Sequence, residues 1–144
     1  MIVIHTSRAT AFMNQSELID FANRYAAAWS SQDPVCLASF YAVNGSLAVN
    51  AGDPSVGRAA IAATAGAFMD AFPDMVVRMD KVIREGNNVA FHWTWTGTNT
   101  GPGGTGKAVR ISGYEEWTIS AGGLIVESKG HYDEAEYQRQ LGDA

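Results

Sequence analysis

The chain has few of the residues that build covalent or metal-held structure. Cys36 is the only cysteine among 144 residues, so no intramolecular disulfide can form and a cysteine metal cluster is excluded. The three histidines, His5, His92 and His131, are not spaced as a pair of metal ligands on one face of an element. We therefore expect no metal site and no cofactor.

Positive charge and long apolar runs are also scarce. Ten Lys and Arg stand against fifteen Asp and Glu, and the net charge of -5 argues against nucleic acid, because phosphate binding needs a basic surface. No apolar run is long enough to span a membrane, and the first twelve residues carry too short an apolar stretch for a signal peptide. We expect a cytoplasmic protein that binds neither nucleic acid nor membrane.

The glycine-rich segment 101–107 has the spacing of a phosphate-binding loop without its chemistry. Ala108 stands where that loop needs a Ser or Thr to hold magnesium, and a strand pattern follows where a helix N-terminus is required. The segment therefore predicts a flexible hairpin loop, and a nucleotide site is excluded.

The length and the 47% hydrophobic content fit one domain with a real core. We expect residues 1–12 to be a flexible N-terminal arm and residues 13–144 to form this single domain. Helical periodicity predicts three early helices, at residues 14–31, 35–41 and 58–72. Alternation predicts later strands at residues 46–50, 75–84, 89–98, 109–119 and 124–133, with a last helix after Asp133. Helices early and strands late indicate an α+β fold, with helices on one face of a mostly antiparallel sheet.

Strand parity places one carboxylate on the apolar face of the sheet. Glu115 shares a face with Gly113 and Trp117, whereas Glu116 lies on the other face. An ionised side chain among core residues is costly unless it is paired or has a task. Burial raises the pKa of a carboxyl group, so Glu115 is either a general acid or base, or a structural or ligand-anchoring group fixed by hydrogen bonds.

The aromatic side chains on the same face suggest what Glu115 faces. The parity of the strands puts Phe91, Trp93, Trp95 and Trp117 inside, with His92, Thr94 and Glu116 outside. Such aromatic groups either fill a core or wall a pocket for a flat apolar ligand.

Six segments, in this order and spacing, resemble the SnoaL-like polyketide cyclase family within the nuclear transport factor two-like superfamily. They are residues 25–33 (YAAAWSSQD), 57–61 (GRAAI), 71–74 (AFPD), 89–101 (VAFHWTWTGTNTG), 123–127 (GLIVE) and 131–133 (HYD). The resemblance implies a cone-shaped fold, in which the three N-terminal helices pack on the concave face of a curved sheet. It also implies a homodimer that pairs through the outer face, which carries the largely uncharged row Ala90, His92, Thr94 and Thr96.

The resemblance does not carry over a reaction. The cyclases of this family look as if they use an Asp two residues after a His on the last strand, and these positions fall at Gly130 and Ser128. In steroid isomerase relatives of the same fold a Tyr of the first helix donates to an oxyanion, and Tyr25 matches it. The base of those enzymes falls near Val49 or Asn50, where the chain has no carboxylate.

These observations predict an apolar pocket for a small hydrophobic or aromatic molecule. Glu115 is the expected acid or base and Tyr25 the expected oxyanion donor. The expected ligand-binding residues are Trp29, Phe68, Phe91, Trp93, Trp95, Trp117 and Ser128. Two functions remain open: an enzyme doing acid–base chemistry on a hydrophobic carbonyl compound, and a non-catalytic ligand-binding or interaction module on the same fold.

Overall fold

A computed structural model describes residues 13–142 of the chain as four helices and six strands. The helices are α2 (Gln15–Ser30), α3 (Pro34–Ala38), α4 (Arg58–Ala71) and α5 (Glu134–Gln140). The strands are β1 (Tyr41–Val49), β2 (Ser55–Val56), β3 (Val76–Glu85), β4 (Asn88–Thr98), β5 (Ala108–Ile119) and β6 (Ile125–His131). The arm expected at residues 1–12 lies outside the described residues.

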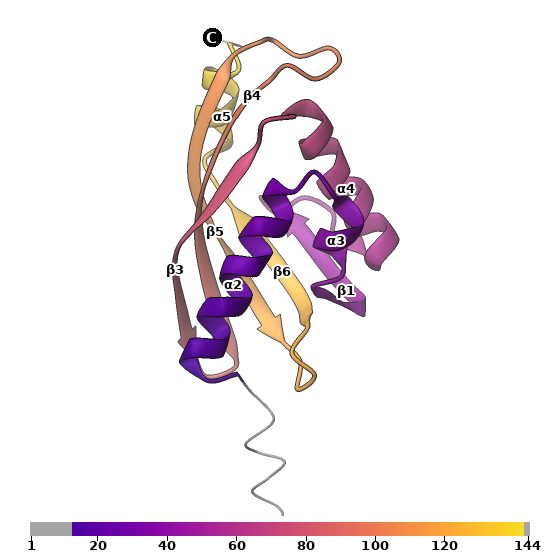
Figure 1. Cartoon of the computed structure of the whole chain (residues 1–144), viewed down its shortest axis with the longest axis vertical. Helices are drawn as coiled ribbons and strands as arrows, with labels where there is room; N and C mark the ends of the chain where they lie inside the picture. The colour runs from indigo at the N-terminus through magenta and orange to yellow at the C-terminus, as the bar shows by residue number, and fades with distance from the viewer. Residues whose placement is uncertain (1–12, 143–144) are drawn as a thin grey trace, which may run out of the picture.

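The six strands form one curved sheet in the order β2-β1-β6-β5-β4-β3. Strands β3 to β6 form an antiparallel meander, and the sheet is parallel only where β1 joins β6. Figure 1 shows α2, α3 and α4 on one side of this sheet. Helix α5 lies at the C-terminus of the chain, beside one end of the long strands. The predicted α+β class is therefore confirmed, with three helices before the meander and a fourth after it. No helix in the described part of the chain is long and apolar enough to cross a membrane.

Local signals set the start of the first two helices. The Asn14 side chain accepts a hydrogen bond from the Glu17 backbone N–H, and the Glu17 carboxylate accepts one from the Asn14 N–H, both at 2.8 Å. This reciprocal capping box begins α2 where the sequence predicts it. Asp33 caps α3 through the Cys36 N–H at 3.1 Å, and Pro34 takes the first helical position.

The main error of the sequence prediction lies between α3 and β1. The predicted helix over residues 35–41 ends at Ala38, and β1 begins at Tyr41, five residues before the strand expected from Ser46. Tyr41 is fully buried and pairs with Ile125 of β6, and its carbonyl accepts a hydrogen bond from Arg58. These partners are distant in sequence, so tertiary packing overrides the local helical pattern.

The register of the meander follows the predicted alternation. Phe91, Trp93, Trp95 and Trp117 are buried on the face that the helices cover. On the outer face, the His92 ring stacks on Tyr114, and Tyr114 stacks on His131. Thr94 lies in this outer row but is buried, and its hydroxyl is satisfied there by donating to Asp80 at 2.6 Å and by a hydrogen bond with Ser112 at 2.8 Å.

A missing side chain on β5 makes room for Trp93. Gly113 lies directly opposite Trp93, and a Cβ atom at Gly113 would come within 2.7 Å of the Trp93 ring and would also clash with the His131 carbonyl. At Gly130 on β6, a Cβ atom would make only ordinary contacts, at 3.5 Å to the Ala48 carbonyl and 3.7 Å to Glu115 Cγ. The two glycines therefore differ in their tolerance of a methyl group.

We expect Gly113→Ala to lower the free energy of unfolding by about 1–3 kcal/mol, the usual penalty of overpacking. Gly130→Ala is the matched control and should stay within about 1 kcal/mol of the wild type, since a tolerated methyl group also restricts the unfolded chain. Urea unfolding measures the free energy of unfolding of both variants, and an unchanged m-value shows that a shift in the midpoint reports stability. Equal destabilisation by the two changes would contradict the packing described for Trp93.

Candidate functional site

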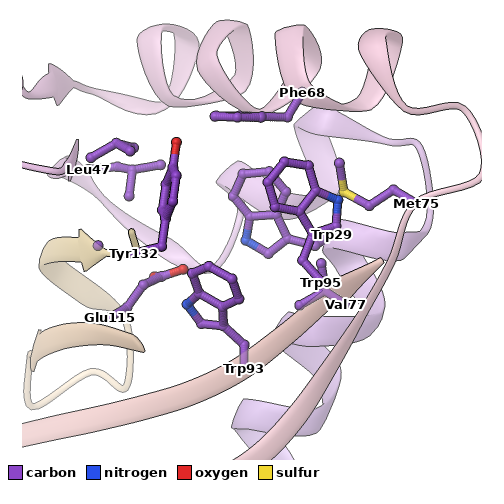
Figure 2. A pocket seen from close by; sticks show the side chains of 11 residues that line it. Trp29, Leu47, Phe68, Met75, Val77, Trp93, Trp95, Glu115 and Tyr132 are labelled. Atoms are coloured by element: carbon purple, nitrogen blue, oxygen red, sulfur yellow. The ribbon is translucent and has the colours of Figure 1, made fainter. Parts of the chain in front are cut away.

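A partly open cavity lies between the helices and the concave face of the sheet (Figure 2). The cavity has a volume of about 70 Å³. Its walls come from α2, α4, five strands and the ends of two connections, and they are mostly aromatic or aliphatic. The lining residues are Trp29, Leu47, Val49, Phe68, Met75, Val77, Trp93, Trp95, Glu115, Gly130 and Tyr132.

The structure divides the predicted site residues into two groups. One group lines the cavity together with Glu115 and comprises Trp29, Phe68, Trp93 and Trp95. The other group packs behind Glu115, away from the cavity lining, and comprises Tyr25, Phe91, Trp117 and Ser128. The first group surrounds the space that a ligand would occupy, and the second surrounds the carboxylate.

The remaining lining residues were not predicted as ligand contacts. Leu47 and Val49 lie on β1, whose extent the local pattern misjudged. Met75 directly precedes β3, and Val77 is the second residue of that strand. Tyr132 follows β6, and its position two residues after Gly130 is the one signal that could have placed it on the cavity side.

The Glu115 carboxylate is held from behind by three hydrogen bonds. Its side chain is buried, with 7% of the residue exposed. Oε1 accepts hydrogen bonds from the Tyr25 hydroxyl at 2.9 Å, the Trp117 indole N–H at 2.8 Å and the Ser128 hydroxyl at 2.7 Å. A second tyrosine extends the network, since the hydroxyls of Tyr25 and Tyr41 lie 2.7 Å apart. Residues from α2, β5 and β6 thus meet at one oxygen atom, and β1 joins the network through Tyr41.

Burial and hydrogen bonding act in opposite directions on this carboxyl group. Burial raises the pKa of Glu115, and the hydrogen bonds from Trp117, Ser128 and Tyr25 offset only part of the rise. Burial and the nearby Glu115 charge also raise the pKa of Tyr25 and of Tyr41 well above the usual value. Both tyrosines therefore stay protonated and remain hydrogen-bond donors at neutral pH.

The second oxygen of Glu115 has a different environment. Within residues 13–142, no hydrogen bond engages Oε2, whereas Oε1 accepts three. Gly130 pairs directly with Glu115 across β5 and β6 and lines the cavity with it. Because Gly130 has no side chain, the carboxylate is reached from the cavity, where Figure 2 shows it beside Tyr132 and Trp93. A proton on Glu115 would sit on Oε2, since the lone pairs of Oε1 are engaged.

The far wall of the cavity is an aromatic cluster. Trp95 packs edge-on against Phe68 and Phe72, at ring-centre distances of 5.7 and 4.9 Å, and Trp29 packs against Phe68 at 6.3 Å. Tyr132 lies 6.2 Å from Trp93 at the other end. These faces favour a flat, apolar occupant.

Helix α5 holds this end of the cavity in place. The Asn50 side chain accepts a hydrogen bond from the Tyr132 backbone N–H at 2.9 Å. The Gln140 side chain accepts from the Arg110 N–H at 2.6 Å and donates to the Arg110 carbonyl at 3.0 Å. The Asn50 side chain also donates to the Glu134 carboxylate at 3.4 Å, so α5 is tied to the residue that follows β1 and, through Gln140, to β5. In the described residues, no group of three His, Cys, Asp or Glu side chains could hold a metal ion.

Several solved structures share this architecture. A protein with a ketosteroid isomerase-like fold from Catenulispora acidiphila, in complex with trimethylamine, is 20% identical, with a TM-score of 0.75 over 85% of this chain and 92% of that one. TsrD from Streptomyces laurentii is 18% identical, with a TM-score of 0.78 over 92% and 100%. SalBIII, an epoxide hydrolase/cyclase-like enzyme of pyran ring formation in salinomycin, is 15% identical, with a TM-score of 0.73 over 85% and 95%.

At these identities the structural matches establish the fold alone. None of the curated proteins compared with the chain matches it in sequence. A family model of the SnoaL-like polyketide cyclases, however, matches residues 19–141, which include all the cavity-lining residues and everything from the second turn of α2 to the end of α5. This match agrees with the resemblance carried by the six sequence segments. The chain therefore belongs to the SnoaL-like polyketide cyclase family.

Proposed function

We propose that this protein is an acid–base catalyst for a compact, apolar carbonyl compound, in which Glu115 moves a proton through Oε2. The observation that carries the proposal is the asymmetry of the carboxylate. Three buried donors hold Oε1, while Oε2 is left to the cavity. Burial raises the pKa of this carboxyl group, which makes Glu115 a stronger base than a free carboxylate and lets it both accept and return a proton.

Tyr25 supports this chemistry from behind the carboxylate. Its hydroxyl lies between Glu115 and Tyr41, and Tyr25 does not line the cavity. We therefore assign Tyr25 to positioning Glu115 and lowering its pKa, in place of the direct contact with a substrate oxyanion that its place on the first helix suggests. Ser128 and Trp117 have the same positioning role.

The relatives support the class of reaction more than any one substrate. The structures of this fold include a protein with a ketosteroid isomerase-like fold in complex with trimethylamine and an epoxide hydrolase/cyclase-like enzyme. The position of the family's Asp is occupied here by Gly130, so ring closure by that residue has no acid to perform it. Proton transfer next to a carbonyl group requires only the one carboxylate that the cavity has.

A second candidate function is ligand binding without catalysis. It is favoured by the same three hydrogen bonds to Oε1, which would fix a purely structural Glu115 equally well. The two functions differ in what happens when the carboxylate loses its ability to ionise.

We expect Glu115→Gln to abolish catalysis with little loss of stability, because an amide oxygen still accepts the three hydrogen bonds but the group cannot take up a proton. The substrates are a panel of small aromatic ketones such as 1-tetralone. NMR monitors the exchange of hydrogen for deuterium at the carbon next to the carbonyl group. A loss of at least about 100-fold is the usual contribution of a general base.

Glu116→Gln is the matched control, since Glu116 lies on the outer face next to His131. It should leave exchange unchanged. If Glu115→Gln instead keeps full activity and lowers the melting temperature, Glu115 is structural and the catalytic proposal fails. If the wild type accelerates no exchange on the panel, the binding module is the better account.

The raised pKa of Glu115 also predicts a pH-dependent contribution to stability. The native state binds the proton more tightly than the unfolded chain, so this contribution is fully present below the unfolded pKa of about 4.3 and is lost as pH rises through the native pKa. The free energy of unfolding of the wild type minus that of Glu115→Gln should therefore fall over this window, by about 1.4 kcal/mol for each unit of the rise. Urea titrations from pH 4 to 8 measure the difference. A difference that increases with pH would contradict the raised pKa.

We also propose that two copies pair through the outer face of the sheet. The stacked rings of His92, Tyr114 and His131, with ring centres 5.5 and 4.7 Å apart, form an uninterrupted row there. Light scattering at micromolar concentration should give the mass of a dimer. Tyr114→Glu should shift it toward the monomer by placing a charge in the row, whereas Val35→Glu, at an exposed apolar position on α3, should not. A monomeric wild type would contradict this proposal.

A further inference from the structure

Two tryptophans in the cavity wall carry polar groups that the protein does not use. The indole N–H groups of Trp93 and Trp95 are buried and have no hydrogen-bond partner in the described part of the chain. The residues themselves are 8% and 5% exposed, and both line the cavity. Trp117 on the neighbouring strand differs, because its N–H donates to Glu115.

Unpaired donors of this kind are unusual. A buried Trp N–H normally finds an acceptor, and leaving it without one costs free energy relative to the unfolded chain, where water satisfies it. Packing alone would be served by a phenylalanine, which has no donor. Two such groups side by side in the wall of one cavity therefore point to an occupant that supplies acceptors.

The positions of the two indoles relative to Glu115 follow from the strand register. Trp93 pairs with Gly113, two residues from Glu115 on the same face of β5, and Trp95 pairs with Ile111. A Cβ atom at Gly113 would touch Cζ2 and Cη2 of Trp93, and Cζ2 belongs to the edge of the indole that carries Nε1. The Trp93 N–H thus lies on the Glu115 side, as Figure 2 shows, and Trp95 lies about 7 Å further along β4.

The charge of the cavity narrows the class of occupant. Among its eleven lining residues, Glu115 is the only one with a carboxyl group, and none is Lys, Arg or His. An anionic ligand would meet an ionised Glu115 without a compensating cation, at a high cost in a buried site. The donors on the wall, by contrast, suit neutral oxygen acceptors.

We propose that the indole N–H groups of Trp93 and Trp95 bind two oxygen acceptors of the ligand, so the occupant is a neutral, flat diketone or a closely related two-oxygen ring compound. One ketone oxygen lies at Trp93, with its enolisable carbon facing Glu115. The reaction at this carbon rests on the proposed function. Its C–H bond breaks, the proton passes to Oε2 of Glu115, and the electron pair of the bond forms the C=C bond of an enolate. The negative charge gathers on the oxygen that the Trp93 N–H binds, and return of the proton completes exchange or isomerisation.

The first test compares four probes that share one bicyclic framework: tetralin, 1-tetralone, 2,3-dihydro-1,4-naphthoquinone and tetrahydroisoquinoline. They carry no oxygen, one ketone, two ketones and a cationic amine. We expect the diketone to bind most tightly, 1-tetralone next and tetralin at least about tenfold more weakly than the diketone, since each hydrogen bond gained contributes severalfold. Calorimetry on the wild-type protein measures all four.

The second readout is spectroscopic and needs no destabilising change. The chain has four tryptophans, so indole ¹H–¹⁵N spectra contain four side-chain signals. The signals of Trp93 and Trp95 should move downfield with the diketone and not with tetralin. The signal of Trp117, which already donates to Glu115, is the internal control.

Substitutions then assign the signals and the binding energy. Trp93→Phe and Trp95→Phe should each weaken the diketone severalfold more than tetralin, because both ligands lose the same apolar contact but only one loses a hydrogen bond. Trp29→Phe is the matched control, since Trp29 lines the same cavity and interacts with Tyr25. It should weaken both ligands equally.

Several outcomes would overturn the inference. Equal binding of tetralin and the ketones would do so, as would indole signals that do not move when the diketone binds. Tightest binding of tetrahydroisoquinoline would instead make the cavity an aromatic cage for a cation. The absence of saturable binding by any probe would also contradict the inference. The proposed function fails separately. If the diketone binds through the two indoles but neither it nor 1-tetralone exchanges its enolisable protons, the inference about the ligand stands and catalysis does not. Glu115→Gln should retain the order of binding in either case.

Discussion

The structure around the cavity depends on keeping one carboxyl group buried in an aromatic core. A carboxylate in such surroundings is stable only if hydrogen bonds replace the water that it loses. Glu115 receives three of them on a single oxygen, from Tyr25, Trp117 and Ser128. Each donor belongs to a different element, so α2, β5 and β6 must all be in place for the site to exist. The positions of the helix and the two strands are in this way coupled to the state of one side chain.

The aromatic packing makes this arrangement rigid. Phe91 and Trp117 stack at 4.8 Å, nearly parallel, and Tyr25 packs edge-on against both. The Tyr25 ring can therefore turn little without disturbing its neighbours, and its hydroxyl stays directed at Glu115. Two positions beside this cluster that have no side chain shape the cavity. Gly113 admits the Trp93 ring, and Gly130 leaves the space in front of the carboxylate.

The alternation of the sequence predicts the part of the site that lies on regular strands. It placed Trp93, Trp95, Trp117 and Glu115 on one face, because a two-residue period needs only local information. It could not predict that Tyr25 and Glu115, which are 90 residues apart, share a hydrogen bond. Nor could it find Tyr41, whose apolar neighbours continue a helical pattern although the strand pairing with β6 begins there. Contacts between distant segments decide both cases, and the local sequence does not encode them.

The same distinction explains why the role expected of Tyr25 changes once its surroundings are known. A tyrosine on the first helix of this fold suggests an oxyanion donor, but a hydroxyl can donate only one proton, and here it is directed at Glu115. If the cavity stabilises a developing negative charge, the donors must come from elsewhere in its wall. The unpaired N–H groups there belong to Trp93 and Trp95. In the proposed function, the carboxylate therefore lies on the strand next to Gly130, where the resemblance places the family's acid, and the donors lie on the strand beyond it.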